Sequence, residues 1–395
     1  MIRGALAAGT VVALVAVGCG GDGGPSRGEA LTIYVSAPLH GPRAAAGIGI
    51  ERGARLALGD AGARAGQLKV RSVYLDDTAG GGWSIARTAA NARRAAEDSS
   101  TIGYIGELDS GATRVSLPIT NRAGIAQVSP GSSSVDLTRL SPAGGADPDR
   151  YRPGGERSFA RVVPADDVQA RAAAAWARRA GANGIEVLND ATTYGRTVAD
   201  AFVQAARGFA LHPRTLRGRV GFATARRVTA SRSGAIFFGG SAAAAVQPLR
   251  LLAPAVPAAT IFGPDALIDP AFLRGAAAFQ DRLRLTSPFL DPSLLPARGR
   301  RFVRAYASRF GGHPAPAAAY GYESMALLLD AIRRAGAGGD DRGKVIDALL
   351  STSDRGSVLG TYSIDGNGDT TLDTVSGYRI SDGLPVFPVR LRARR

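Results

Sequence analysis

The chain has 395 residues, of which 45% are hydrophobic and 21% charged, and this composition supports large buried cores and excludes a globally disordered protein. Its formal net charge of +15 comes from arginines spread along the whole chain. Since no compact basic run with interleaved aromatic residues occurs, the charge does not indicate a nucleic-acid partner.

The first residues predict export from the cytoplasm. Arg3 precedes an apolar stretch, residues 6–17, that is too short to remain as a membrane-spanning helix, and Cys19, the only cysteine, follows. This order resembles a bacterial lipoprotein signal peptide over residues 1–18, cleaved before Cys19, whose sulfur would carry a lipid. A simple secretory signal with an incidental cysteine is the alternative. We therefore expect an extracytoplasmic protein that is lipid-anchored to the cell membrane, with residues 19–30 as a flexible Gly-rich tether.

Short apolar runs alternate with longer amphipathic segments between residues 31 and 130. Strands are predicted over 31–38, 68–77, 101–107 and 124–130, and helices over 44–58, 83–98 and 111–123. This alternation is typical of a parallel sheet with helices on both faces. It predicts a first α/β lobe.

A polar segment rich in Gly and Pro, residues 141–158, predicts a surface loop near a lobe boundary. The strand and helix pattern then restarts. Helices are predicted over 166–181, 194–208, 242–253, 298–310 and 317–336, strands over 184–190, 234–240 and 259–264, and a β-hairpin over 358–380. The restart predicts a second α/β lobe.

The sequence carries no recognisable catalytic or metal-binding motif. His40, His212 and His313 lie far apart without metal-ligand spacing, and neither a Walker loop nor a nucleophile elbow occurs. The segment DGNGD at 365–369 lacks the later glycine and glutamate of a calcium loop, so we interpret it as a hairpin turn. We therefore expect no enzymatic activity, no metal and no cofactor.

Polar residues follow four of the predicted strands, and ligands of open α/β sheets bind outside these carboxyl ends. Ser110 follows one strand and Gly131, Ser132 and Ser133 follow the next, and their hydroxyls and backbone amides suit an anion such as a carboxylate. Tyr194 and Asp265 follow strands of the second lobe, where the negative charge of Asp265 suits an ammonium group. Helix capping by Ser110 and Ser133 is the alternative. Together these residues predict a site for a zwitterion.

Several segments, in chain order, resemble one family of solute receptors. The longest is YIGELDSGATRVSLPITNRAGIAQVSPGSSSVDLT at 104–138, and the others lie at 76–77, 159–170, 189–195, 237–240, 262–267 and 318–332. They are similar to the leucine/isoleucine/valine-binding proteins of branched-chain amino acid ABC transporters. The resemblance implies a type 1 periplasmic binding fold, with two doubly wound parallel-sheet lobes joined by a three-strand hinge. It implies a first lobe of about 30–158 plus 290–355 and a second of about 159–289 plus 356–395.

The resemblance also implies roles for individual residues. Ser110 and the loop Gly131–Ser133 would hold the ligand's α-carboxylate, and Gly131 would be small so that the carboxylate can approach the backbone. Tyr194 and Asp265 would contribute from the second lobe, with Asp265 on the α-ammonium in place of the family's commoner glutamate. Ser241 stands where an aromatic residue is common, which puts a strict preference for Leu, Ile or Val in doubt.

The function implied by the resemblance is capture of an amino acid between two closing lobes, followed by docking of the receptor, a monomer, on a membrane permease. No reaction is catalysed. A sensory receptor of the same fold, recognising amides or other small carboxylates, is the alternative. A hydrolase would need a nucleophile and base, which the sequence does not present.

Overall fold

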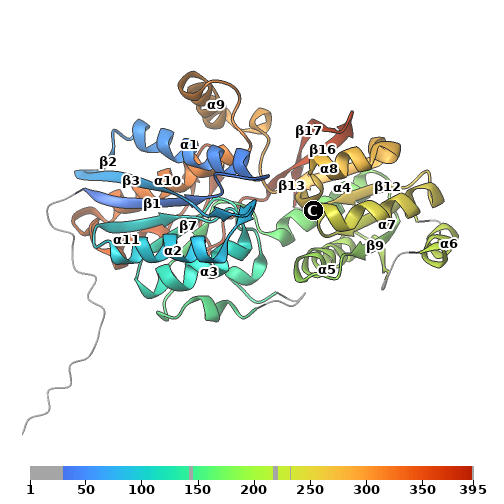
Figure 1. The fold of residues 1–395 in the computed structure, drawn as a ribbon, viewed down its shortest axis with the longest axis horizontal. Coiled ribbons are helices and arrows are strands. Elements are labelled where there is room, and N and C mark those ends of the chain that lie inside the picture. The colour runs from blue at the N-terminus through green and yellow to red at the C-terminus, as the bar shows by residue number, and fades with distance from the viewer. Residues whose placement is uncertain (1–29, 142–145, 217–220, 232, 394–395) are drawn as a thin grey trace, which may run out of the picture.

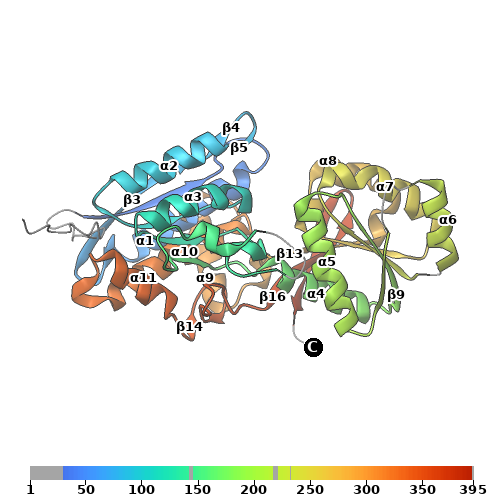
Figure 2. The same cartoon turned by 90° about the horizontal axis from the view of Figure 1, so that it is seen from below.

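Two α/β lobes lie side by side along the long axis of the molecule (Figure 1). The computed structural model describes residues 30–141, 146–216, 221–231 and 233–393. Each lobe contains one main sheet with helices on both faces, as the turned view in Figure 2 also shows. The chain passes between the sheets three times, after β8 (Phe159–Arg161), after β13 (Leu283–Ser287) and before β16 (Thr374–Ser381). The predicted fold class is therefore confirmed.

The first lobe is organised by a six-stranded sheet that is parallel except for one short edge strand. Its spatial order is β2 (Arg64–Ala65), β3 (Leu68–Asp76), β1 (Leu31–Ala37), β6 (Thr101–Ile105), β7 (Ala126–Ser129) and β8. Every residue of the central strand β1 is buried, because helices cover both of its faces. The helices of this lobe are α1 (Ala44–Asp60), α2 (Ile85–Glu97), α3 (Ser110–Arg122), α9 (Ala297–Phe310), α10 (Ala317–Arg334) and α11 (Arg342–Leu350).

Two glycines bring α1 and α10 into close contact on one face of this sheet. A Cβ atom at Gly53 would lie 2.1 Å from the carbonyl oxygen of Ala318, and one at Gly321 would lie 2.3 Å from that of Ile50. The backbones of the two helices therefore meet without intervening side chains. Their apolar residues, with those of α11, form the main core of the lobe.

The second lobe is organised by a seven-stranded sheet. Its spatial order is β10 (His212–Thr215), β9 (Gly184–Asn189), β11 (Ala235–Gly239), β12 (Thr260–Gly263), β13, β16 and β17 (Leu384–Arg392). The first five strands are parallel and the last two are antiparallel. The helices of this lobe are α4 (Asp166–Arg179), α5 (Thr193–Gly208), α6 (Phe222–Ser231), α7 (Ala242–Ala255) and α8 (Pro270–Gly275). Phe202 of α5 stacks on Phe237 of β11, with ring centroids 3.9 Å apart, and anchors α5 to the sheet.

The C-terminal hairpin lies later in the chain than the alternating pattern predicted. It is formed by β16 and β17, so the prediction over 358–380 is wrong. The turn at 365–369 closes only one antiparallel bridge, between Ile364 and Thr370. The Asp365 carboxylate accepts hydrogen bonds from the amides of Asn367 and Asp369, which stabilises this turn without long flanking strands. The sequence pattern also did not assign β10, α6, β13 and α11.

The lobe boundaries differ from those implied by the resemblance. Strand β8 pairs with β7 in the first sheet, so the first lobe continues to Arg161. Tyr362 and Ile364 pack into the core of the first lobe, so the C-terminal part of the second lobe begins near β16. The segment 141–158, of which 142–145 lie outside the described residues, is more than a surface loop. It contains a 3-10 helix, Pro148–Tyr151, whose buried Tyr151 packs against Leu117 of α3.

The predicted signal peptide, Cys19 and the tether up to residue 29 lie outside the described residues. Within the described ranges, none of the helices has both the length and the apolar character needed to span a bilayer.

Two buried carboxyl groups, Asp77 and Glu107, lie at the carboxyl ends of β3 and β6. Both side chains are fully buried. Tyr104 donates a 2.7 Å hydrogen bond to Glu107 Oε1, whereas among the described residues Glu107 Oε2 and both Asp77 oxygens have no partner other than the facing carboxyl group. Burial, with added repulsion from Asp109, raises the pKa of Asp77 to about 6. Burial and the charge of Asp77 also raise the pKa of Glu107. The pair therefore retains protons more strongly than exposed carboxyl groups do.

Replacement of Asp77 by asparagine is expected to stabilise the protein at neutral pH. The pKa of Asp77 is about 6 in the folded protein, and about 3.9 in the unfolded chain. The folding penalty of its charge is therefore absent below pH ~4, grows between pH ~4 and ~6 and is complete above that. Relative to wild type, Asp77→Asn should gain ~1–3 kcal/mol at pH 7.5 and lose that advantage near pH 4, as measured by urea unfolding. If Asp77→Asn were no more stable than wild type at pH 7.5, or more stable by the same amount at both pH values, the raised pKa of Asp77 would be contradicted.

Candidate functional site

A cavity of about 310 Å³ lies between the carboxyl ends of the two sheets. Loops after β6 and β7 form its wall on the first lobe, and loops after β9 and β12 form its wall on the second. Phe289, which follows β13 in a segment that joins the lobes, also lines it. The cavity therefore has one wall from each lobe and one side at the hinge.

Five of the seven ligand-site residues predicted from the sequence line this cavity. They are Ser110, Gly131, Ser133, Tyr194 and Asp265.

The other two predicted residues, Ser132 and Ser241, do not line the cavity. The Ser132 side chain is fully buried, donates to the carbonyl oxygen of Glu107 at 3.1 Å and shares a 2.7 Å hydrogen bond with Thr113. Ser241 is exposed at the start of α7, where its amide donates to Asp190 Oδ2 at 2.9 Å. A sequence pattern places a residue in a loop but does not show toward which side of the loop it points.

Side-chain hydroxyls of the first lobe occupy most backbone amides of the loop after β7, which we call the serine loop (residues 131–134). Ser129 Oγ accepts from the amides of Gly131 at 3.2 Å and Ser132 at 2.8 Å, and Ser110 Oγ accepts from the amide of Ser134 at 3.1 Å. In the described part of the chain, only the amide of Ser133 remains without a partner among these four. The serine loop thus presents one free amide, that of Ser133, rather than a row of free amides, and the Ser133 hydroxyl is hydrogen-bonded to the Asp166 carboxyl group.

Packing accounts for the glycine at position 131. A Cβ atom there would lie 2.6 Å from Leu108 Cδ1 and 2.7 Å from the Leu108 carbonyl oxygen. The loops after β6 and β7 are therefore in direct contact below the cavity. The close approach of a ligand, expected from the resemblance, is not needed to explain Gly131.

The structure adds an ion pair on the first lobe that sequence reasoning missed. Arg114 Nη2 donates to Asp136 Oδ1 and to Ser134 Oγ, each at 2.8 Å, and Arg114 Nε lies 3.3 Å from Asp136 Oδ2. Burial alone would raise the pKa of Asp136, but the hydrogen bonds from Arg114 and Ser134 outweigh this effect. The pKa of Asp136 is therefore below its usual range. Arg114 follows Ser110 by four residues on α3, a spacing that places both on one helix face and could have indicated it.

Sequence reasoning also missed Arg43 and Trp83. They follow the predicted strands 31–38 and 68–77, after which no ligand-site residue was expected. Arg43 precedes α1, and its guanidinium lies 3.5 Å from Asp109 Oδ1. Trp83 belongs to a short hairpin of β4 (Thr78–Ala79) and β5 (Gly82–Trp83). Its ring packs so closely on Gly111 that a Cβ atom there would lie 2.5 Å from Trp83 Cζ2. An aromatic ring therefore covers the start of α3.

Two carboxyl groups make the second-lobe wall electronegative. Gln169 of α4 donates to Asp265 Oδ1 at 3.1 Å and to the carbonyl oxygen of Thr286 at 3.0 Å, which fixes Asp265. Burial raises the pKa of Asp265. Asp166, at the start of α4, is 4% exposed, and burial together with the charge of Asp265 raises its pKa to about 6. Because both groups are harder to ionise than exposed carboxylates, a bound cation would stabilise them.

Metal ligands do not gather in this region. Across the described residues, no group of three or more His, Cys, Asp or Glu side chains is placed to hold a metal ion. His40 pairs instead with Asp76, at 2.8 Å, and His212 is exposed on the edge strand β10.

A family model described as a periplasmic binding protein matches residues 31–383. The chain belongs to the periplasmic binding protein family. This confirms the resemblance seen in the sequence motifs. Members of this family are extracytoplasmic substrate-binding proteins rather than enzymes. No curated protein sequence matches the chain.

Solved structures share the fold of this periplasmic binding protein over nearly their whole length. The leucine-binding protein LivK of Thermotoga maritima is 22% identical, with a TM-score of 0.72 over 92% of this chain and 99% of that one. An ABC transporter substrate-binding protein of Desulfitobacterium hafniense, in complex with Leu, is 22% identical, with a TM-score of 0.72 over 91% and 99%. A solute-binding protein of R. palustris, in complex with benzoate, is 17% identical, with a TM-score of 0.67 over 92% and 96%.

Replacement of Gly131 by alanine is expected to destabilise the first lobe, because the new methyl group overlaps backbone atoms of Leu108. Overpacking of this kind costs ~1–3 kcal/mol. Gly59→Ala is the matched control, since Gly59 is exposed in α1 and a Cβ atom there meets nothing within 4 Å. It should stabilise by about 0.5–1 kcal/mol through helix propensity. Urea unfolding of both variants measures the effects, and an unchanged stability of Gly131→Ala would show that the contact with Leu108 relaxes freely.

Proposed function

We propose that this periplasmic binding protein captures an amino acid between its two lobes and presents it to the permease of an ABC transporter. The opposite character of the two cavity walls carries this proposal. The first-lobe wall presents the amide of Ser133, which has no partner within the described chain and suits a carboxylate. The second-lobe wall presents Asp265 and Asp166, which suit an ammonium group.

Apolar groups on the cavity wall support a ligand with an apolar side chain. Leu108, Trp83 and Phe289 contribute to the lining besides the charged and hydroxyl-bearing residues. The volume of about 310 Å³ is at the small end of the usual range for ligand pockets, about 300–1,000 Å³. A branched-chain or similar amino acid matches both properties.

The ligands named for similar structures support recognition of a carboxylate. One of them holds Leu, and two proteins of R. palustris hold benzoate and 4-hydroxybenzoate. All three ligands carry a carboxylate, but only Leu carries an ammonium group. We propose that Asp265 selects the amino acid in this chain, and that Tyr194 and Ser110 contact the ligand when the lobes close.

Asp265→Asn is expected to weaken L-leucine binding and to reduce discrimination against 4-methylpentanoate, which is leucine without its amino group. Loss of one partner of a buried charge pair costs ~2–5 kcal/mol of binding free energy. Titration calorimetry of both compounds on wild type and variant measures the change. Asp269→Asn is the matched control, because Asp269 caps α8 four residues later and does not line the cavity. It should change neither the affinity ratio nor, to a large extent, the stability, because asparagine caps a helix about as well as aspartate does.

Two outcomes of this experiment would contradict the proposal. Wild-type protein that binds benzoate or 4-methylpentanoate but not L-leucine would identify a carboxylate receptor without amino acid selectivity. An Asp265→Asn variant that still discriminates as wild type does would place the ammonium partner elsewhere on the cavity wall.

We further propose that Cys19, which lies outside the described residues, carries a lipid that anchors the protein to the cell membrane. The signal-like segment before it and the Gly-rich segment after it support this proposal. Cys19→Ser should move nearly all of the protein from the membrane fraction to the soluble fraction, as followed by fractionation and immunoblotting. Ligand affinity should not change, because the tether precedes β1. If the variant stays with the membrane and is released by high salt, the basic surface rather than a lipid holds it there.

A further inference from the structure

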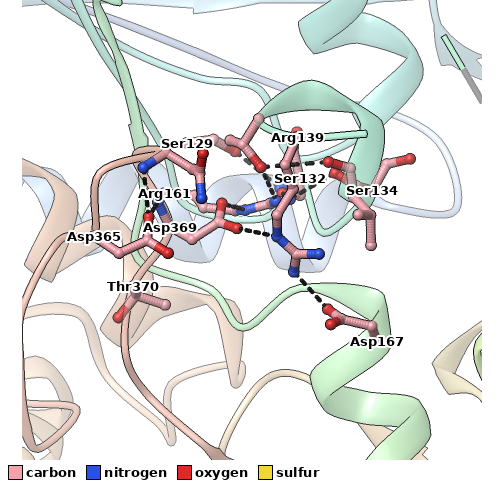
Figure 3. A network of polar contacts seen from close by, with 12 residues as sticks. Ser129, Ser132, Ser134, Arg139, Arg161, Asp167, Asp365, Asp369 and Thr370 are labelled. Atoms are coloured by element: carbon pink, nitrogen blue, oxygen red, sulfur yellow. Dashed lines mark hydrogen bonds and ion pairs between the residues drawn. The ribbon is translucent and has the colours of Figure 1, made fainter. Parts of the chain in front are cut away.

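A fully buried arginine, Arg161 at the end of β8, lies behind the serine loop (Figure 3). Its Nη1 donates to the carbonyl oxygens of Ser132 at 3.0 Å and Ser134 at 2.7 Å. Its Nη2 donates to Thr138 Oγ1 and its Nε to Asp369 Oδ1, both at 2.7 Å. One guanidinium group therefore holds two carbonyl groups of a loop that lines the ligand cavity.

The bond from Arg161 to the Ser132 carbonyl sets the direction of the next amide. The peptide group between Ser132 and Ser133 is planar, and it is trans, since the single cis peptide among the described residues is Gly106–Glu107. In a trans peptide, the carbonyl and the N–H point to opposite sides. With the Ser132 carbonyl directed at Arg161, the N–H of Ser133 points away from it, and this is the amide that has no partner within the described chain.

Ion pairs hold the Arg161 guanidinium in place behind the serine loop. Asp369 is shared between Arg161 and Arg139, whose Nε lies 3.0 Å from Asp369 Oδ2, and Arg139 also pairs with Asp167 at 2.9 Å (Figure 3). Arg171 in turn pairs with Asp167 at 2.9 Å. Asp166, whose amide donates to the Ser133 carbonyl oxygen at 2.8 Å, adds a third carboxyl group to this region, so the three guanidinium groups are balanced by three carboxyl groups. A peptide whose carbonyl is bound to a cation is polarised, so its N–H becomes a stronger donor.

We propose that Arg161 is a positioning residue for carboxylate recognition. It directs the N–H of Ser133 to the cavity side of the serine loop and strengthens that donor for the ligand's carboxylate, without touching the ligand itself. The proposal rests on the proposed function in one respect, namely that the ligand's carboxylate binds at the serine loop. A merely structural role would leave the preference for a carboxylate over an uncharged group unchanged.

Arg161→Lys tests this, because lysine keeps the charge but cannot hold both carbonyl groups with a rigid fork. The readout is the affinity ratio of L-leucine to L-leucinamide, measured by titration calorimetry. The ratio should fall by about tenfold or more, because a hydrogen bond to the charged carboxylate is weakened while amide binding changes less. Arg139→Gln is the matched control, since it breaks two ion pairs beside Arg161 but leaves both carbonyl bonds in place. It should lower the melting temperature and keep the ratio.

A second measurement does not depend on amino acid binding. Acetate titrated into ¹⁵N-labelled wild-type protein should shift the Ser133 amide resonance more than those of Ser132 and Ser134, and Arg161→Lys should remove this shift. If L-leucine fails to bind while acetate shifts Ser133 in this way, the proposed function is wrong and the positioning role stands. A folded Arg161→Lys variant with an unchanged ratio and an unchanged acetate shift would overturn the inference.

The variant Thr138→Val covers the case in which Arg161→Lys does not fold. Valine matches the shape of threonine and removes the acceptor of Arg161 Nη2, together with the hydrogen bonds that the Thr138 hydroxyl makes to the carbonyl oxygen of Val135 at 3.3 Å and to Asp369. A looser guanidinium should lower the ratio of L-leucine to L-leucinamide by a smaller factor and weaken the acetate shift of Ser133. A wild-type protein whose Ser133 amide does not respond to acetate would overturn the inference on its own.

Discussion

The buried ion pair between Arg161 and Asp369 is the constraint on which the middle of this molecule depends. Arg161 ends the last strand of the first sheet, and Asp369 lies in the segment that leads back to the second sheet. Their atoms are 2.7 Å apart, and the Arg161 side chain has no exposure. Removing one partner of a buried ion pair costs about 3–5 kcal/mol. This pair therefore joins two of the three segments that connect the lobes, and Arg161 ties the serine loop to them as one unit.

This unit explains why the site is asymmetric. On the first lobe, hydroxyl groups, backbone groups and guanidinium groups satisfy one another, as in the bidentate pair of Arg114 with Asp136. On the second lobe, the buried Asp166 and the partly buried Asp265 lie near each other without a cation of their own lobe among the described residues, and their pKa values are raised. The first wall thus leaves one loop amide, that of Ser133, without a partner among the described residues, while the second wall retains electrostatic repulsion that a positive group would relieve.

Much of the fold follows from periodicity that is visible in the sequence. The strands and helices between residues 31 and 130 lie within a few residues of their predicted bounds, because buried parallel strands are continuous apolar runs and their helices are amphipathic. The C-terminal hairpin was predicted too early in the chain because residues 365–369 have the composition of a hairpin turn, although no long strands flank them. Ser132 was assigned to the cavity lining because the sequence cannot distinguish a loop residue that faces a cavity from one that supports the loop. Arg43 and Arg161 act through partners that are distant in the sequence, so no local pattern indicates them.

The close packing of α1 against α10 has a consequence for how the protein is made. The two helices are separated by more than 250 residues of chain, and the whole of β9 to β13 in the second lobe lies between them. During synthesis from the N-terminus, the sheet face that α1 shares with α10 therefore stays partly uncovered until nearly the entire chain has emerged, whereas most strands of the second lobe are already present. A chain that completes its N-terminal lobe last stays incompletely folded for longer than one that completes its lobes in order. Chaperones can therefore bind it, and it can be translocated unfolded, over a longer period.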